Sequence, residues 1–411
     1  MLRAIPALVC LLGVAASTLA PTAAEAMIPP GDWRDSPAQA PARPTDARPP
    51  LADQAEKTAR SGRDAGDTGD MTSDNPLAGG PWGVYHGSSD GVWPAYERAS
   101  GTDKDLLAKV ALQPRVRWLH SGIGIGELGD KIRSEIAQEQ DGDPDTLVQF
   151  AWFRLWPDGE GRRNRPLSGR EQADYRAAVD TAVRAIGDAR VAIVLEPDLA
   201  LTAPPMQRGA MATADPGVRQ GLVAYAAKEF SSLPRTSVYL DAGDADWLSP
   251  EKALAELENS GIEYARGFAL GATHYSSVAM NVSYGADLVA ALADDGHPGK
   301  HFVIDTADNG RAFTYPEYYD KHPHGDFDNA EPCGSSSDQR CDTLGHAPTW
   351  ETDADSLGLS DEEARQAAAY VDGYLWFGRP WLVDQAAPFS LQRTLQVARS
   401  TPYDQTNVTG R

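Results

Sequence analysis

Strand-like apolar runs of this sequence end in acidic side chains at several places along the chain. The run VAIVL at 191–195 is continuously apolar, as is typical of a parallel strand covered on both faces, and Pro197 ends it. Because the carboxyl ends of parallel strands meet on one face of a barrel, we expect these acids to converge there. The acids are Asp158, Glu160, Glu196, Asp198, Asp241 and Asp305.

Convergent carboxylates support two kinds of chemistry. A pair of them can hydrolyse a glycosidic bond, and a group of them can bind a hard cation through oxygen. Tryptophans favour the first, because flat apolar rings suit the faces of sugars and several tryptophans flank the acidic strand ends. These are Trp152, Trp156, Trp247, Trp376 and Trp381.

Strand-like runs alternate with amphipathic helical patterns, such as REQADYRAAVDTAVRAIG at 170–187. This alternation indicates an α/β fold with a parallel sheet and helices outside it. The count of about seven strands favours a distorted, TIM-like parallel (β/α) barrel over an open sheet. The runs are VRWL at 116–119, LVQFAWFRL at 147–155, VAIVL at 191–195, SVYLD at 237–241, GFAL at 267–270, HFVID at 301–305 and YLWF at 374–377.

The first 75 residues are unlike the rest of the chain. Residues 1–26 contain Arg3, an apolar run and a small-x-small site at Ala24-Glu25-Ala26, which predicts a secretory signal peptide and an extracellular protein. Residues 27–75 are rich in Pro, Ala and Asp without apolar periodicity, which predicts a disordered linker. Residues 76–411 then form the globular part of the chain.

The formal charge of −22 is spread along the whole chain. This charge opposes binding to nucleic acid or to anionic lipid, and it leaves a neutral or cationic partner such as a polysaccharide or oligosaccharide. No other stretch is apolar enough for a membrane span, so we expect a soluble protein. We also expect a monomer.

Two cysteines, Cys333 and Cys341, remain after the signal. In an exported chain their spacing of eight favours one small-loop disulfide. A metal-binding pair is the weaker alternative, because the nearby His322, His324 and His346 are at no recognised spacing.

Five ordered motifs between about residues 75 and 385 resemble the family 6 glycoside hydrolases, the secreted cellulases and cellobiohydrolases. LEPD at 195–198 resembles the family's strand ending in the catalytic acid, and RGFAL at 266–270 the start of its R-G-F-x-x-N segment. The three others resemble Y-L-D-A-G-H-x-x-W-L, F-V-I-D-T-S-R-N-G and D-A-x-L-W-x-K-x-P-G-E-x-D-G. They are YLDAGDADWL at 239–248, HFVIDTADNG at 301–310 and DGYLWFGRPWLVDQ at 372–385.

The resemblance implies roles for individual residues. Asp198 takes the position of the proton donor, and Asp384 that of the proposed base. Glu160 aligns with the aspartate that raises the pKa of the acid, with Asp158 as the alternative. Asp241 and the tryptophans Trp247 and Trp376 are expected to bind substrate. The family's usual partner for the second cysteine is Ala386 here, which leaves Cys333 and Cys341 to each other.

Residues that bind sugar hydroxyls in the family differ in this chain. A lysine and a glutamate have become Gly378 and Leu382, two asparagines have become Gly271 and His274, and a histidine has become Asp244. The acid-base set is kept while the sugar-binding set is changed.

The sequence therefore predicts a secreted hydrolase that cleaves a β-linked polysaccharide with inversion, on a cellulose-like 1,4-β-glucan by resemblance, without a metal or other cofactor. Two alternatives stay open: a hydrolase for a different glycan, and a non-catalytic glycan-binding protein on the same fold.

Overall fold

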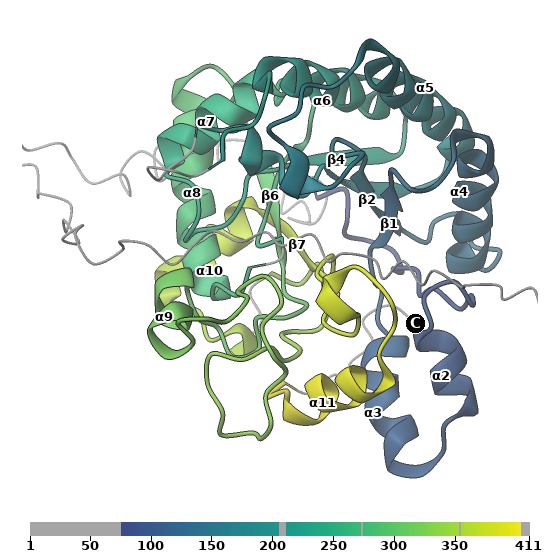
Figure 1. Ribbon diagram of the computed structural model, residues 1–411, viewed down its shortest axis with the longest axis vertical. Helices are drawn as coiled ribbons and strands as arrows, with labels where there is room; N and C mark the ends of the chain where they lie inside the picture. The colour runs from purple at the N-terminus through teal and green to yellow at the C-terminus, as the bar shows by residue number, and fades with distance from the viewer. Residues whose placement is uncertain (1–74, 205–210, 273, 353–354, 404–411) are drawn as a thin grey trace, which may run out of the picture.

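A computed structural model describes residues 75–204, 211–272, 274–352 and 355–403 (Figure 1). The predicted signal peptide and nearly all of the predicted linker lie outside these residues. Within them, no helix is long and apolar enough to cross a membrane.

Seven parallel strands form one sheet in chain order, from β1 to β7. The two outer strands do not pair with each other, although Val116, just before β1, donates a backbone hydrogen bond to Trp376, just after β7 (2.9 Å). The prediction of a distorted parallel barrel of about seven strands is confirmed. The strands are β1 (Arg117–His120), β2 (Val148–Phe153), β3 (Val191–Leu195), β4 (Thr236–Asp241), β5 (Gly267–Leu270), β6 (His301–Asp305) and β7 (Val371–Leu375).

Helices follow the strands and cover the outside of the sheet (Figure 1). The helix predicted from the pattern at 170–187 is α5, which Ser168 and Glu171 start with a capping box. The helices are α2 (Val92–Arg98), α3 (Gly101–Ala111), α4 (Ile125–Gln140), α5 (Gly169–Ile186), α6 (Pro216–Ser231), α7 (Pro250–Asn259), α8 (Val278–Asp294), α9 (Tyr315–Lys321), α10 (Asp361–Tyr370) and α11 (Leu391–Ser400). The last of these packs against α3.

The alternation of side chains along each strand divides the core in two. On β3, Ile193 and Leu195 face the helices, while Ala192 and Val194 face the barrel interior. The interior is filled by side chains from successive strands, such as Ala151, Val194 and Tyr239, together with Trp82 from the segment before α2. The carboxyl ends of the strands are therefore the open end of a filled barrel, where barrel enzymes carry their chemistry.

The long connection between β6 and β7 contains Cys333 and Cys341, which are joined in a disulfide with their Cα atoms 5.0 Å apart. The predicted pairing of these two cysteines is confirmed.

Candidate active site

The two acids at the end of β3 point in different directions. Glu196 and Asp198 both have left-handed backbone conformations, with φ of 56° and 70°. Glu196 is fully buried, and it accepts hydrogen bonds from the backbone N–H groups of Arg154 and Leu155 (each 3.0 Å) and from the Tyr175 hydroxyl (2.8 Å). It therefore ties the ends of β2 and β3 together, while Asp198 stays partly accessible to solvent.

Asp198 lies in a strongly acidic environment. The surrounding protein displaces water and raises its pKa well above the usual range, and the charges of Glu160, Asp241 and Asp328 raise it further. The imidazolium of His274 acts in the opposite direction. A raised pKa favours the protonated carboxyl of Asp198, which is the form that can donate a proton.

Glu160 and Asp158, the two candidates for the acid that raises the pKa of Asp198, have different environments in the structure. Glu160 begins a short 3-10 helix, Glu160–Arg162, and is half-buried. Burial raises its pKa, while Arg379 and Arg163 lower it. Asp158 is exposed and forms a surface ion pair with Arg165 (2.6 Å). Of these two acids, Glu160 is the one whose charge acts strongly on Asp198.

Asp241 ends β4 and is completely buried. Burial raises its pKa to about 8, although the backbone N–H groups of Gly243 and Ala200 lower it. It lies close enough to Asp198 to raise the pKa of that acid. The structure therefore brings together Asp198, Glu160 and Asp241, three of the residues predicted for the site.

Asp305 ends β6 but is turned toward the backbone. One of its carboxylate oxygens accepts from Ala307 N (2.9 Å), and the other accepts from the N–H of Gly378. Burial raises its pKa to about 7. Asp305 therefore joins the end of β6 to the segment that follows β7.

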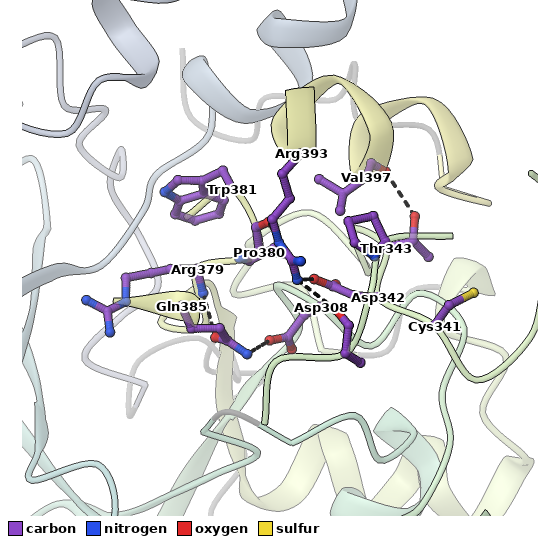
Figure 2. Close-up of polar contacts among 12 residues, drawn as sticks. Asp308, Cys341, Asp342, Thr343, Arg379, Pro380, Trp381, Gln385, Arg393 and Val397 are labelled. Atoms are coloured by element: carbon purple, nitrogen blue, oxygen red, sulfur yellow. Dashed lines mark hydrogen bonds and ion pairs between the residues drawn. The ribbon is translucent and has the colours of Figure 1, made fainter. Parts of the chain in front are cut away.

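Asp384 differs from these acids in its exposure. It is exposed, with a left-handed φ of 51°, and its charge is not one of those that act most strongly on Asp198 among the described residues. The next residue, Gln385, is buried instead. Its Nε2 donates to Asp308 Oδ2, and its Oε1 accepts from Arg379 N, each at 3.1 Å (Figure 2). The same Nε2 also donates to the carbonyl of Asp328 (3.1 Å).

Three charged residues at the site were not predicted from the sequence: Arg379, Arg163 and Asp328. Arg379 lies over the ring of Trp118, with its guanidinium carbon 3.7 Å from the ring centre, and it interacts with the charges of Asp198 and Glu160. Arg379 directly follows Gly378, the position where the family has a lysine, and this neighbouring cation could have identified Arg379 from the sequence. Asp328 is exposed on the connection between β6 and β7, and no sequence pattern pointed to it.

The tryptophans are mostly part of the core. Trp247 is half-buried and stacks on His274, with the ring centres 4.8 Å apart and the planes at 7°. Trp376, predicted to bind substrate, is fully buried, and its Nε1 donates to the carbonyl of His346 (2.8 Å). It offers no ring face to a sugar, which corrects that expectation. Trp152, Trp156 and Trp381 are also buried.

Comparisons with known proteins agree with the motifs. The model of the glycosyl hydrolases family 6 matches residues 85–357. Endoglucanase A of Cellulomonas fimi is 34% identical over 232 residues, which are 56% of this chain and 47% of that protein, so the chain spans about half the length of this relative.

Solved structures show the same likeness. The endoglucanase Cel6 of Mycobacterium tuberculosis, in complex with methyl-cellobiosyl-4-deoxy-4-thio-β-D-cellobioside, has a TM-score of 0.62 and 25% identity, over 79% of this chain and 99% of that one. The catalytic core of the cellobiohydrolase Cel6A of Chaetomium thermophilum, at 19% identity, shares the fold with a TM-score of 0.59 over 80% of this chain and 98% of its own. The chain belongs to the glycosyl hydrolases family 6.

Proposed function

We propose that this chain hydrolyses a β-linked glucan of the cellulose type, with Asp198 as the proton donor. Family membership and the endoglucanase relatives support the reaction class and the substrate. The observation that carries the proposal is the position of Asp198 at the open end of the barrel, partly accessible to solvent, where burial and neighbouring carboxylates raise its pKa.

The surroundings of Asp198 suit both halves of a proton transfer. Before the reaction, Glu160 and Asp241 favour the neutral acid, which can protonate the glycosidic oxygen as the bond breaks. After the transfer Asp198 is a carboxylate, and the guanidinium groups of Arg379 and Arg163 lie close enough to stabilise it. A positioned general acid of this kind contributes about 10²- to 10⁴-fold to the rate.

The second carboxylate of the reaction must activate a water molecule. In an inverting enzyme the two carboxyl groups are about 6.5 to 9.5 Å apart, so that water fits between the sugar and the base. The family motif assigns this role to Asp384, which is exposed in the structure; the location of Asp328 beside Asp198 makes it the alternative. We propose Asp384 as the base, acting through a water molecule, with Asp328 as its competitor.

The proposal is tested by measuring reducing sugar released from a panel of soluble β-glucans. Asp198→Asn should lower kcat by about 10²- to 10⁴-fold, whereas Asp158→Asn, a change in a surface ion pair, should leave it within twofold. A wild-type protein that binds these glucans without cleaving any of them would favour the non-catalytic alternative. Cleavage of other β-linked glycans only would favour the hydrolase for a different glycan.

Inversion is tested on the same substrates by NMR of the first-formed product. A β-linked substrate should yield the α-anomer before mutarotation, and early β-product would exclude an inverting mechanism. Asp384→Asn and Asp328→Asn identify the base, because loss of the base should lower kcat on every substrate, including those with good leaving groups. If only Asp328→Asn does so, the assignment of Asp384 is wrong.

We also propose that the protein is secreted and acts as a monomer. The sequence of residues 1–26 supports export, with cleavage after Ala26. Amino-terminal sequencing of protein recovered from the culture medium should begin at Met27; a protein that keeps Met1 inside the cell would contradict this. Light scattering of the purified protein should give the mass of one chain.

A further inference from the structure

A second group of potential ligands lies next to the acidic site, between the loops that follow β4 and β5. It consists of Asp244, Asp246 and His274, and one possible ligand atom from each lies within 4.8 Å of the other two. All three side chains are at least nine-tenths buried: Asp244 is 0% exposed, and the side chains of Asp246 and His274 are 5% and 8% exposed. Two departures from the family's motifs, Asp244 and His274, therefore meet at one place.

Hydrogen bonds hold the three side chains in position. Asp246 accepts from the backbone of Tyr315 with one oxygen (2.7 Å) and contacts Nδ1 of His274 with the other (2.8 Å). Asp244 accepts from its neighbour Asp246 N (3.1 Å) and from Asn281 Nδ2 (3.2 Å). Each carboxylate oxygen that accepts one hydrogen bond keeps a further lone pair that can bind a cation.

An independent feature of α8 points to a missing ligand. The hydroxyl of Tyr284 is buried, and it has no hydrogen-bond partner among the described residues. Tyr284 is 9% exposed and lies three positions after Asn281, so the two share the face of α8 that contacts Asp244. The phenol also interacts with the charges of Asp244 and Asp241. A buried hydroxyl without a partner is costly, and a cation or its bound water would supply one.

We infer that Asp244, Asp246 and His274 bind a divalent transition-metal ion of the zinc class. One imidazole nitrogen and two carboxylate oxygens suit Zn²⁺, whereas Ca²⁺ and Mg²⁺ prefer oxygen ligands alone. Zinc bonds to such atoms are about 2.0 to 2.2 Å long, which places tetrahedral ligand atoms about 3.3 Å apart. To share one ion, His274 Nδ1 and Asp246 would move apart from 2.8 Å, and any pair near the limit of 4.8 Å would move closer together. In the metal-free protein, the contact between the His274 imidazolium and Asp246 occupies this place, so binding of the ion would release the proton of His274 Nδ1 to solvent.

The ion would connect two loops of the acidic site. Asp244 and Asp246 follow β4, and His274 follows β5, so a shared ligand fixes the distance between these loops. Trp247, which stacks on His274, would be held by the same connection. The inference concerns metal binding, and it stands or falls independently of the proposed hydrolase activity.

Calorimetric titration of ZnCl₂ into the EDTA-treated full chain tests the site. We expect one ion bound per chain with a dissociation constant in the micromolar range or below, and at least tenfold weaker binding of CaCl₂. His274→Asn and Asp244→Asn should each weaken zinc binding at least tenfold. The matched control is His297→Ala, which removes a histidine from a more exposed group with Glu258 and Asp295, and it should change nothing.

Unchanged zinc binding in both site variants, or loss of binding in the control, would overturn the inference. Circular dichroism in EDTA checks that each variant is folded. Zinc K-edge absorption of the wild-type protein does not depend on any variant. It should show mixed nitrogen and oxygen ligands at one site, and a chain that retains no zinc or binds it by oxygen alone would contradict the inference.

Discussion

Replacement of Gly378 by alanine should destabilise the protein, although alanine is ordinarily the more favourable residue. Gly378 follows β7, where the family has a lysine, and its N–H donates to Asp305. A Cβ atom at this position would lie 2.8 Å from Asp308 Oδ2, 3.0 Å from Asp305 Oδ2 and 3.2 Å from the Cβ of Ala307. All three neighbours are buried, so the added carbon must displace at least one carboxyl group.

The size of the effect follows from these contacts. Inserting a methyl group into a packed site costs about 1 to 3 kcal/mol. Moving Asp308 also breaks its 3.1 Å hydrogen bond with Gln385 Nε2, at about 0.5 to 1.5 kcal/mol. The smaller entropy of the unfolded alanine chain returns about 0.4 to 1 kcal/mol. The net loss for Gly378→Ala should be about 0.5 to 4 kcal/mol.

Urea unfolding followed by tryptophan fluorescence measures this loss. In Asp308→Ala the oxygen that lies nearest to the new carbon is gone, so the double variant should be more stable than the two single losses predict, by about 1 kcal/mol. The control is Gly126→Ala in α4, where a Cβ atom meets nothing within 4 Å and should stabilise the helix by up to about 1 kcal/mol. A Gly378→Ala protein as stable as the wild type, or additive losses in the double variant, would refute the argument.

Two other predictions concern the site and the disulfide. Glu160→Gln removes a negative charge that raises the pKa of Asp198, so the acid loses its proton at lower pH and the high-pH limb of kcat/KM should move to lower pH; Asp158→Asn should leave that limb in place, and the reverse pattern would show that the wrong carboxylate was chosen. Changing both Cys333 and Cys341 to serine removes the disulfide across an eight-residue separation. The free energy of unfolding in urea should fall by about 2 to 3 kcal/mol, and an unchanged midpoint would mean that the disulfide does not stabilise the fold.

The barrel and the location of its acids could be predicted from the sequence because they depend on local patterns. A continuously apolar run such as VAIVL is buried on both faces, and Pro197 ends it, so the position of Asp198 at the carboxyl end of β3 follows directly. The orientation of each acid could not be predicted in this way. Glu196 and Asp198 differ because both residues take left-handed conformations, and Glu196 is thereby brought to the backbone just after β2.

The tryptophans show a second feature that could not be predicted from the sequence, namely the direction in which each ring points. Trp152 lies on β2 near the open end, as predicted, but the alternation of the strand directs its ring outward to Tyr175 and Phe230 under the helices. Proximity to a strand end in sequence does not say which face a side chain takes. Trp247 is the exception, because it lies on the loop after β4, and loops at the carboxyl ends of strands can reach the site.

Residues that differ from the family's motif after β7 meet at one carboxyl group, so their replacements are better explained as one change in packing than as separate losses of sugar-binding side chains. Gly378 leaves room for the carboxyl group of Asp308, which stands where the family's F-V-I-D-T-S-R-N-G motif has an arginine, and Gln385 binds that carboxyl group from the following turn. The inward position of Gln385 leaves Asp384 exposed, although the spacing of the motif is kept. These contacts join residues about 70 positions apart, so no local pattern could have predicted them. Because Arg379 still brings a cation to Asp198, the substitutions rearrange the wall of the site around an unchanged acid.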